Sequence, residues 1–222
     1  MRFSRFAALL ATAFLVAAPV GGHSAEPLLT ETDYFGEMPQ VLTATRLAQP
    51  ALESPASLTV IGRDQIVASG ARDVAELLRL VPGFQVSYFS ANRPVVTYHG
   101  LSDDFARRLQ VLVDGRSVYT PIFGGVLWSG LSLSVRDIER IEVVRSPNAA
   151  TYGPNSFSAV INIITRHAAA DDGAHVSATR GQRKQTDGFA RMHGGLGTGH
   201  YRVSLEHEED AGFEDRHDGR NL

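Results

Sequence analysis

The spacing of apolar and polar residues changes along the chain and divides it into four regions. Residues 1–25 contain one apolar run behind two arginines, and residues 26–50 sustain neither a helical nor a strand period. Residues 51–168 hold short apolar runs separated by glycine and proline, which is typical of a small domain with helices and strands. In residues 169–222 apolar and polar side chains alternate, which is typical of strands whose two faces differ.

Residues 51–168 predict an α+β domain, a small mixed sheet with short helices. Helices are expected over 64–70 and 73–81, and the segments 88–93 and 119–125 are expected to be loops. Strands are expected at 57–61, 95–98, 110–113, 116–119, 140–144 and 159–165. The expected core consists of the apolar residues Val60, Ile61, Leu77, Leu78, Val111, Val113, Ile141, Val143, Ile161 and Ile163.

The C-terminal region predicts three antiparallel strands, near 175–180, 189–194 and 200–206, with a tight glycine-rich turn at 194–199. In the last strand Tyr201, Val203 and Leu205 share one face, and the residues between them are polar. This alternation fits the first strands of a transmembrane β-barrel, and it equally fits an ordinary antiparallel sheet with one solvated face. Three strands cannot close a barrel, because even small barrels need about 8.

The first 25 residues have the order of a secretory signal peptide. Arg2 and Arg5 precede an apolar run over 6–18, and small residues then lead to an expected cleavage between Ala25 and Glu26. The run is too short to cross a bilayer as a helix, so an N-terminal membrane anchor is the weaker alternative. The chain is therefore expected to be exported through the inner membrane.

Residues 26–50 are predicted to form an extended periplasmic tether containing Pro39 and Pro50. Within it lies a short β-prone segment at 40–46. A segment of this kind in a flexible arm can add itself as a strand to the sheet edge of another protein. From composition alone, a β-prone stretch without a partner is the simpler interpretation.

Composition narrows the chemistry. The chain has no cysteine, which excludes disulfides, thiolate metal sites and thiol catalysis, and its net charge of −3 without a basic face argues against a nucleic-acid partner. Ser102, Asp103 and Asp104 cluster with His99, but neither a nucleophile elbow nor metal-ligand spacing surrounds them. We therefore expect the chain to have no catalytic residue, no metal site and no cofactor, and we expect that it is not an enzyme.

Six blocks of residues stand out along the predicted α+β domain. They are Pro-Ala-Ser-Leu-Thr-Val-Ile at 55–61, Glu-Leu-Leu-Arg-Leu-Val-Pro-Gly at 76–83, Val-Leu-Val-Asp-Gly at 111–115, Asp-Ile-Glu-Arg-Ile-Glu-Val-Val-Arg at 137–145, Tyr-Gly at 152–153 and Val-Ile-Asn-Ile-Ile-Thr at 160–165. Taken together, these blocks resemble successive signatures of the TonB-dependent receptor plug. The blocks follow the order and approximate spacing of the family, and the resemblance covers about residues 40–166.

The resemblance implies a plug inside a large β-barrel of the Gram-negative outer membrane. Such receptors take up scarce ligands, typically ferric siderophores, haem, cobalamin or oligosaccharides, and the periplasmic protein TonB supplies the energy. The resemblance also implies that the segment at 40–46 is a TonB box, formed by Gln40, Val41, Leu42, Thr43, Ala44, Thr45 and Arg46. The alternative is a truncated, exported plug that senses ligand or binds TonB without transport.

Two further groups of candidate residues follow from the resemblance. Aromatic-rich loops suited to a flat chelate or a sugar supply the expected ligand contacts Tyr88, Phe89, Asn92, Arg93, Tyr119, Ile122 and Phe123, although each could instead pack within the protein. Arg145 and His99 are expected to lock plug to barrel. The family often has arginine before glycine where this chain has His99-Gly100, and Arg-Gly-Pro where it has Arg145-Ser146-Pro147, so Arg145 is the better candidate.

Overall fold

The computed structural model describes residues 40–43, 49–50, 56–90, 93–101, 105–153, 155–170, 173–182, 184–209 and 211. These residues all belong to one unit, Met38–Leu222. The expected signal peptide and most of the expected tether lie outside them. Among the described residues, no helix is long and apolar enough to cross a membrane.

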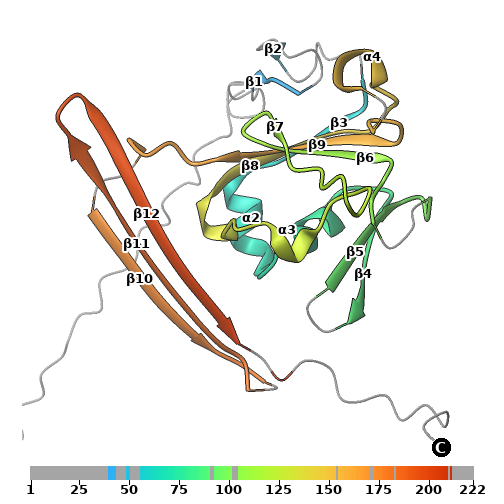
Figure 1. Ribbon diagram of the computed structural model, residues 1–222. Helices are drawn as coiled ribbons and strands as arrows, with labels where there is room; N and C mark the ends of the chain where they lie inside the picture. The colour runs from blue at the N-terminus through green and yellow to red at the C-terminus, as the bar shows by residue number, and fades with distance from the viewer. Residues whose placement is uncertain are drawn as a thin grey trace, which may run out of the picture. The chain divides into compact units, whose positions relative to one another are not determined.

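A five-stranded mixed sheet forms the centre of the α+β domain (Figure 1), with strand order β3-β8-β9-β6-β7. All its neighbours pair antiparallel except β6 and β9, which pair parallel. This confirms the predicted α+β class. The strands are β3 (Leu58–Ile61), β6 (Leu109–Val113), β7 (Arg116–Ser117), β8 (Ile138–Val144) and β9 (Ala159–Thr165).

One face of this sheet packs against short helices to form the main core. Val111, Val143 and Ile161 are completely buried there, together with Leu77 and Leu78 from the helical segment. Of the expected core residues, only Val60 and Val113 are half-buried. The helical elements are α2 (Arg63–Ser69), α3 (Val74–Leu77), η2 (Leu78–Leu80), η3 (Trp128–Gly130), η4 (Val135–Asp137) and α4 (Ala149–Tyr152).

The opposite face of the sheet carries a smaller apolar cluster. Leu112, Val144 and Val160 are buried in it, and Leu58 and Tyr152 pack against them. The same face also carries Glu142, which lies between Val144 and Arg140 along β8, because alternate residues of a strand share a face. The N-terminal strands β1 (Gln40–Val41) and β2 (Gln49–Pro50) pair antiparallel with each other.

A separate hairpin, β4 (Phe84–Ser90) and β5 (Arg93–Tyr98), replaces most of the loop expected at 88–93. That loop expectation is wrong, because side chains along β4 alternate between the interior and the surface through Tyr88 and Phe89. The pairing contains an irregularity between Tyr88 and Ser90. The segment 119–125 is irregular as expected, and one bridge between Thr120 and Gly125 closes it.

The C-terminal region forms a three-stranded antiparallel sheet in the order β10-β11-β12. Its strands are β10 (Gly173–Arg180), β11 (Thr186–Leu196) and β12 (Gly199–Glu209), and the last two are longer than the alternating pattern predicts. A tight turn joins β11 to β12. Within the described part of the chain, β10 and β12 each pair with one neighbour only.

The two faces of this sheet have opposite surroundings. The register aligns Met192 with Val203 and Ala190 with Leu205, and this apolar face is exposed, with Leu205 69% and Val203 53% accessible. The polar face bonds the α+β domain, where Asp187 and His193 are buried. An ordinary water-soluble sheet would bury its apolar face instead. The arrangement therefore matches the opening strands of a transmembrane β-barrel.

Candidate ligand and coupling sites

Four side chains from three segments form a continuous stack, which we call the aromatic ladder. The Arg93 guanidinium lies 4.8 Å from the centre of the Phe89 ring and 4.9 Å from that of Phe105. Phe105 stacks on Phe123 with 5.2 Å between ring centres and 8° between ring planes. The ladder thus places one cation between two aromatic rings, an arrangement favoured by the negative potential of aromatic faces, and a third ring stacks on one of them.

Local backbone structure positions each part of the aromatic ladder. Phe89 lies on the exposed side of β4 and Arg93 begins β5, so the hairpin presents both from one end. The turn that carries Phe123 is closed by the Thr120 amide, which donates to the Gly125 carbonyl at 2.8 Å. A Cβ at Gly125 would lie only 2.7 Å from the Phe105 Cβ, so glycine allows the two segments to approach.

The aromatic ladder is open to solvent. Phe89 is 65% exposed, Phe123 is 42% exposed, and the neighbouring Ile122 is 85% exposed. An exposed cluster of apolar side chains beside a cation suits a ligand with flat or apolar parts and negative charge. Three of the four ladder residues, Phe89, Arg93 and Phe123, are among the ligand contacts expected from the sequence. The fourth, Phe105, is a lone aromatic after two aspartates and was not predicted.

Tyr88, also predicted to contact ligand, lies on the opposite side of β4 from Phe89. Its hydroxyl donates toward Glu76 Oε1 at 2.9 Å and Asp73 Oδ2 at 3.2 Å. Burial, followed by the bond to Glu76, raises the pKa of the Tyr88 phenol. Burial, followed by the charge of Glu76, raises the pKa of Asp73. Tyr119 is half-buried, and Asn92 lies outside the described residues.

The described part of the predicted coupling segment, residues 40–43, is packed onto the α+β domain. Val41 and Thr43 are completely buried. The backbone amides of Leu42 and Thr43 each donate to Glu142 Oε2 at 3.0 Å, and the Thr43 hydroxyl donates to the same oxygen at 2.5 Å. The rest of the predicted segment, Ala44, Thr45 and Arg46, lies outside the described residues.

Glu142 is itself completely buried and fully engaged. Its second oxygen, Oε1, accepts a hydrogen bond from Arg140 Nε at 2.9 Å. Beside it, the Tyr152 hydroxyl donates to the Thr43 carbonyl at 2.8 Å. Glu142 belongs to the family-like block at 137–145, but local sequence does not reveal its partners, since its donors Leu42 and Thr43 lie about a hundred residues earlier in the chain.

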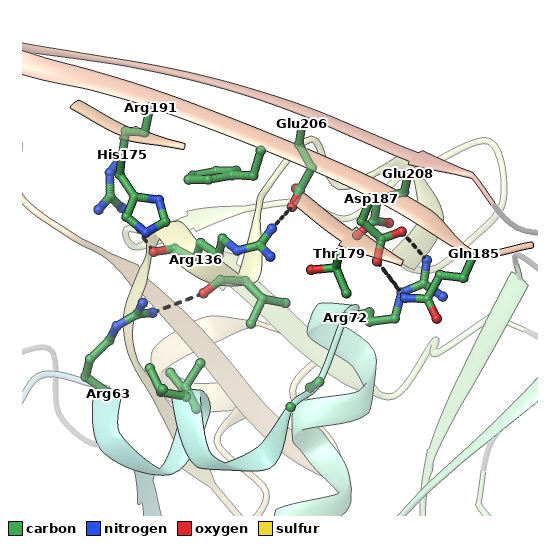
Figure 2. A pocket seen from close by; sticks show the side chains of 16 residues that line it. Arg63, Arg72, Arg136, His175, Thr179, Gln185, Asp187, Arg191, Glu206 and Glu208 are labelled. Atoms are coloured by element: carbon green, nitrogen blue, oxygen red, sulfur yellow. Dashed lines mark hydrogen bonds and ion pairs between the residues drawn. The ribbon is translucent and has the colours of Figure 1, made fainter. Parts of the chain in front are cut away.

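Ion pairs join the polar face of the C-terminal sheet to the α+β domain (Figure 2). Arg72 makes a two-pronged contact with Asp187, at 2.8 and 3.2 Å. The Glu206 carboxylate also accepts a hydrogen bond from the Ser134 hydroxyl at 2.9 Å. Arg191 Nη1 lies 3.1 Å from Asp137 Oδ1, and both side chains are nearly buried. Buried, paired charges of this kind add little net stability, because the cost of removing them from water offsets much of their attraction.

The same contacts surround a cavity of about 500 Å³ between α2 and the strands β10 and β11. Arg63 lines it and donates to the Ile138 carbonyl at 2.9 Å. Burial, and then the nearby charge of Arg166, lowers the pKa of Arg63. Among the described residues, no group of three or more histidine, aspartate or glutamate side chains is placed to hold a metal ion.

Comparison with known proteins now decides the family. Residues 50–160 match the model of the TonB-dependent receptor plug domain, which is half of the chain. This chain belongs to the TonB-dependent receptor plug family. The family is one of receptors, not enzymes, and the α+β domain is the plug.

Individual relatives agree with this assignment. The chain is 33% identical over 181 residues to a vitamin B12 transporter, BtuB, of Photobacterium profundum, covering 79% of this chain and 28% of the transporter. It is 34% identical over 131 residues to an iron-regulated outer membrane virulence protein of Vibrio cholerae, covering 57% of this chain and 20% of the relative. The chain therefore spans under a third of the length of either relative.

Solved structures share the fold. The ferripyoverdine receptor of Pseudomonas aeruginosa superimposes with a TM-score of 0.63 at 22% identity, over 78% of this chain and 22% of the receptor. The matched length is far greater than the plug alone. The likeness therefore extends to the start of the barrel, in agreement with the orientation of the two faces of β10–β12.

The two residues predicted to lock plug and barrel lie apart from the ion pairs described above. Arg145 is half-buried, its amide donates to the Ser57 carbonyl at 2.8 Å, and its Nε is buried without a hydrogen-bond partner among the described residues. His99 is exposed, has a φ of 53°, and lies edge-on to the Tyr98 ring at 4.2 Å. In the described part of the chain neither forms an ion pair with β10–β12.

Proposed function

We propose that this chain is the N-terminal part of an outer-membrane receptor for energised uptake of a scarce ligand. The ligand is a ferric siderophore, haem, cobalamin or a similar compound. The plug gates the barrel, and residues 40–46 couple it to TonB in the periplasm. The signal peptide directs the chain across the inner membrane and is removed.

The observation that carries this proposal is the orientation of β10–β12. A sheet whose polar face holds a folded domain by ion pairs, and whose apolar face is exposed, is stable where that apolar face meets lipid. A plug enclosed by such strands closes the passage that they surround. Transport then requires the plug to change its position or shape.

The aromatic ladder supports the choice of ligand class. Its exposed rings and the guanidinium of Arg93 suit a bulky compound that combines flat or apolar parts with negative charge. Related proteins are described as a vitamin B12 transporter and a ferripyoverdine receptor. A large metal complex is therefore the class that the ladder and the relatives share.

A general argument and one observed feature support the proposed partners. Strand addition at residues 40–46 supplies many backbone hydrogen bonds, which suits a contact that must transmit force from TonB. The buried Nε of Arg145 lacks an acceptor among the described residues, so a carboxylate from a strand beyond them fits the proposed lock. His99 is retained as a weaker second candidate for that lock.

Separate measurements of ligand binding and uptake test the function. The full-length receptor is expressed in a strain without its own receptors and given radiolabelled cyanocobalamin or iron-loaded siderophores. Arg93→Ala should weaken binding of the cognate compound about tenfold, about 1.4 kcal/mol, because the central cation of the ladder is lost. Val41→Pro should leave binding within about twofold and abolish uptake, because proline removes a backbone donor.

If the wild-type receptor binds none of these compounds, the proposed ligand class is overturned. Unchanged uptake by Val41→Pro would overturn the coupling role of residues 40–46 while leaving ligand binding intact. Loss of binding in Val41→Pro would show that the substitution acts through the plug fold and not through TonB.

A further inference from the structure

Residues 42 and 43 use, within the plug, the same backbone groups that strand addition requires. The amides of Leu42 and Thr43 donate to Glu142, and the Thr43 carbonyl accepts from Tyr152. A strand that joins a sheet edge must offer its amides and carbonyls to the new neighbour. These groups cannot serve the plug and a partner sheet at the same time.

Burial makes the competition complete for this part of the segment. Val41 and Thr43 have no accessible surface, so a partner cannot reach them while they remain on the plug. The Thr43 hydroxyl also donates to Glu142 Oε2, which therefore accepts three hydrogen bonds from two consecutive residues. Hydrogen bonds to a carboxylate are roughly twice as strong as those between neutral groups.

From these contacts we infer that Glu142 is the positioning residue that holds residues 40–43 on the plug and so competes with TonB for the coupling segment. This inference rests on the proposed function for the identity of the partner only. TonB then binds the fraction of receptors whose segment has left Glu142, and its apparent affinity falls in proportion to that fraction.

The geometry singles out Glu142 from a neighbouring carboxylate. Glu139, three residues earlier on β8, is 45% exposed and pairs with Arg166 at 3.6 Å. Glu139→Gln therefore makes the same chemical change on the same strand away from residues 40–43. Tyr152→Phe is a second probe, because it removes the hydroxyl that donates to Thr43 and leaves the buried carboxylate in place.

The first experiment measures amide hydrogen exchange at Leu42 and Thr43 in the full-length receptor, purified in detergent without ligand. Glu142→Gln should increase exchange at both amides at least about tenfold, because one carboxamide oxygen cannot serve both Arg140 and the segment. Tyr152→Phe should increase exchange by a smaller factor. Glu139→Gln should leave it unchanged.

The second experiment measures the affinity of the same receptors for the purified C-terminal domain of TonB. The Glu142→Gln variant should bind the TonB domain about tenfold more tightly than wild type does. The Tyr152→Phe variant should show a smaller gain in affinity, and the Glu139→Gln variant should bind with the affinity of wild type. None of the three substitutions alters residues 40–46, so an increase in affinity reflects release of the segment and not a better partner strand. Exchange in β6 and β9 is followed in parallel to show that each variant keeps the plug sheet.

The outcomes separate this inference from the proposed function. Unchanged exchange at Leu42 and Thr43 in a folded Glu142→Gln variant overturns the role of Glu142, whatever TonB does. Faster exchange with unchanged TonB affinity overturns the competition. Failure of every receptor, wild type included, to bind TonB overturns the proposed coupling role and leaves the hold by Glu142 standing. If the Glu142→Gln variant does not keep the plug sheet, the same two measurements on the Tyr152→Phe variant test the inference.

Discussion

Tyr88 and Phe89 show how one residue step separates two roles in β4. Phe89 faces outward in the aromatic ladder, and Tyr88 reaches the carboxylates of Asp73 and Glu76 beneath the hairpin. Glu76 also accepts from the Arg72 amide at 3.0 Å, and Arg72 pairs with Asp187 of β11. A chain of direct contacts from Tyr88 through Glu76 and Arg72 to Asp187 thus connects the exposed hairpin to the C-terminal sheet.

Asp73 gives a prediction on pH. Burial and the neighbouring charge of Glu76 raise its pKa in the folded protein above the ordinary 3.8. Folding therefore favours protonated Asp73, and this contribution is complete below pH 3.8 and is lost as the pH rises through the raised pKa. Asparagine at position 73 does not titrate. The stability of Asp73→Asn relative to wild type should therefore increase as the pH rises from 3.8 through the raised pKa of Asp73.

Thermal unfolding of the full-length receptor, measured from about pH 3.5 to 7, checks this expectation. Asp64→Asn is the control, because Asp64 is exposed in the first turn of α2. A curve for Asp73→Asn that runs parallel to that of wild type would contradict the prediction.

Among the elements, the turn at 120–125 depends on close backbone approach. Gly125 lies against residues 105 and 106, and the turn holds Phe123 onto Phe105. The aromatic ladder is therefore assembled by three elements that are separate in sequence, the hairpin β4–β5, the segment at 105 and this turn. Its integrity depends on backbone spacing as much as on the aromatic side chains.

Gly125→Ala is expected to destabilise the receptor by about 1–3 kcal/mol, because the added methyl group would overlap Phe105 and the Ala106 backbone. Gly195→Ala is the matched control, since a Cβ at this position in β11 would meet no atom within 4 Å. Chemical denaturation measures the difference in unfolding free energy, and amide exchange over 120–125 locates it. Equal effects at both glycines would show that loss of glycine, and not the contact, is responsible.

On the scale of the whole molecule, the C-terminal sheet separates a polar interior from an apolar exterior. Thr179 lines the cavity beside the plug, and Val203 is exposed on the opposite face. The proposed membrane position assigns Val203 to lipid and Thr179 to the interior. The same substitution at the two sites should therefore have different effects.

Val203→Arg is expected to destabilise the receptor in the membrane by up to about 2–4 kcal/mol, the range for arginine facing the bilayer midplane. Thr179→Arg should be tolerated, because its charge enters a polar cavity. Folding into lipid vesicles followed by urea denaturation gives both values. Equal stability of the two variants would count against a lipid-facing position for Val203.

Local patterns predicted much of the plug. Apolar runs bounded by glycine located the central strands, and helical spacing placed Leu77 and Leu78 in the core, because backbone periodicity directly determines which side chains share a face. The segment 88–93 was instead expected to be an aromatic-rich loop at an apex of the plug. In the fold, pairing with β5 extends β4 to Ser90.

The family, the α+β class, most core residues and the alternation of β12 could be predicted from the amino-acid sequence, since each depends on residues close in the chain or on ordered signatures. Alternation shows that two faces of a strand differ, but it does not say what each face meets. Three features are visible only in the folded chain: the polar face of β10–β12 packs on the plug, Phe105 completes the aromatic ladder, and Thr43 bonds Glu142. These contacts join residues far apart in sequence, and their geometry depends on how the whole chain folds.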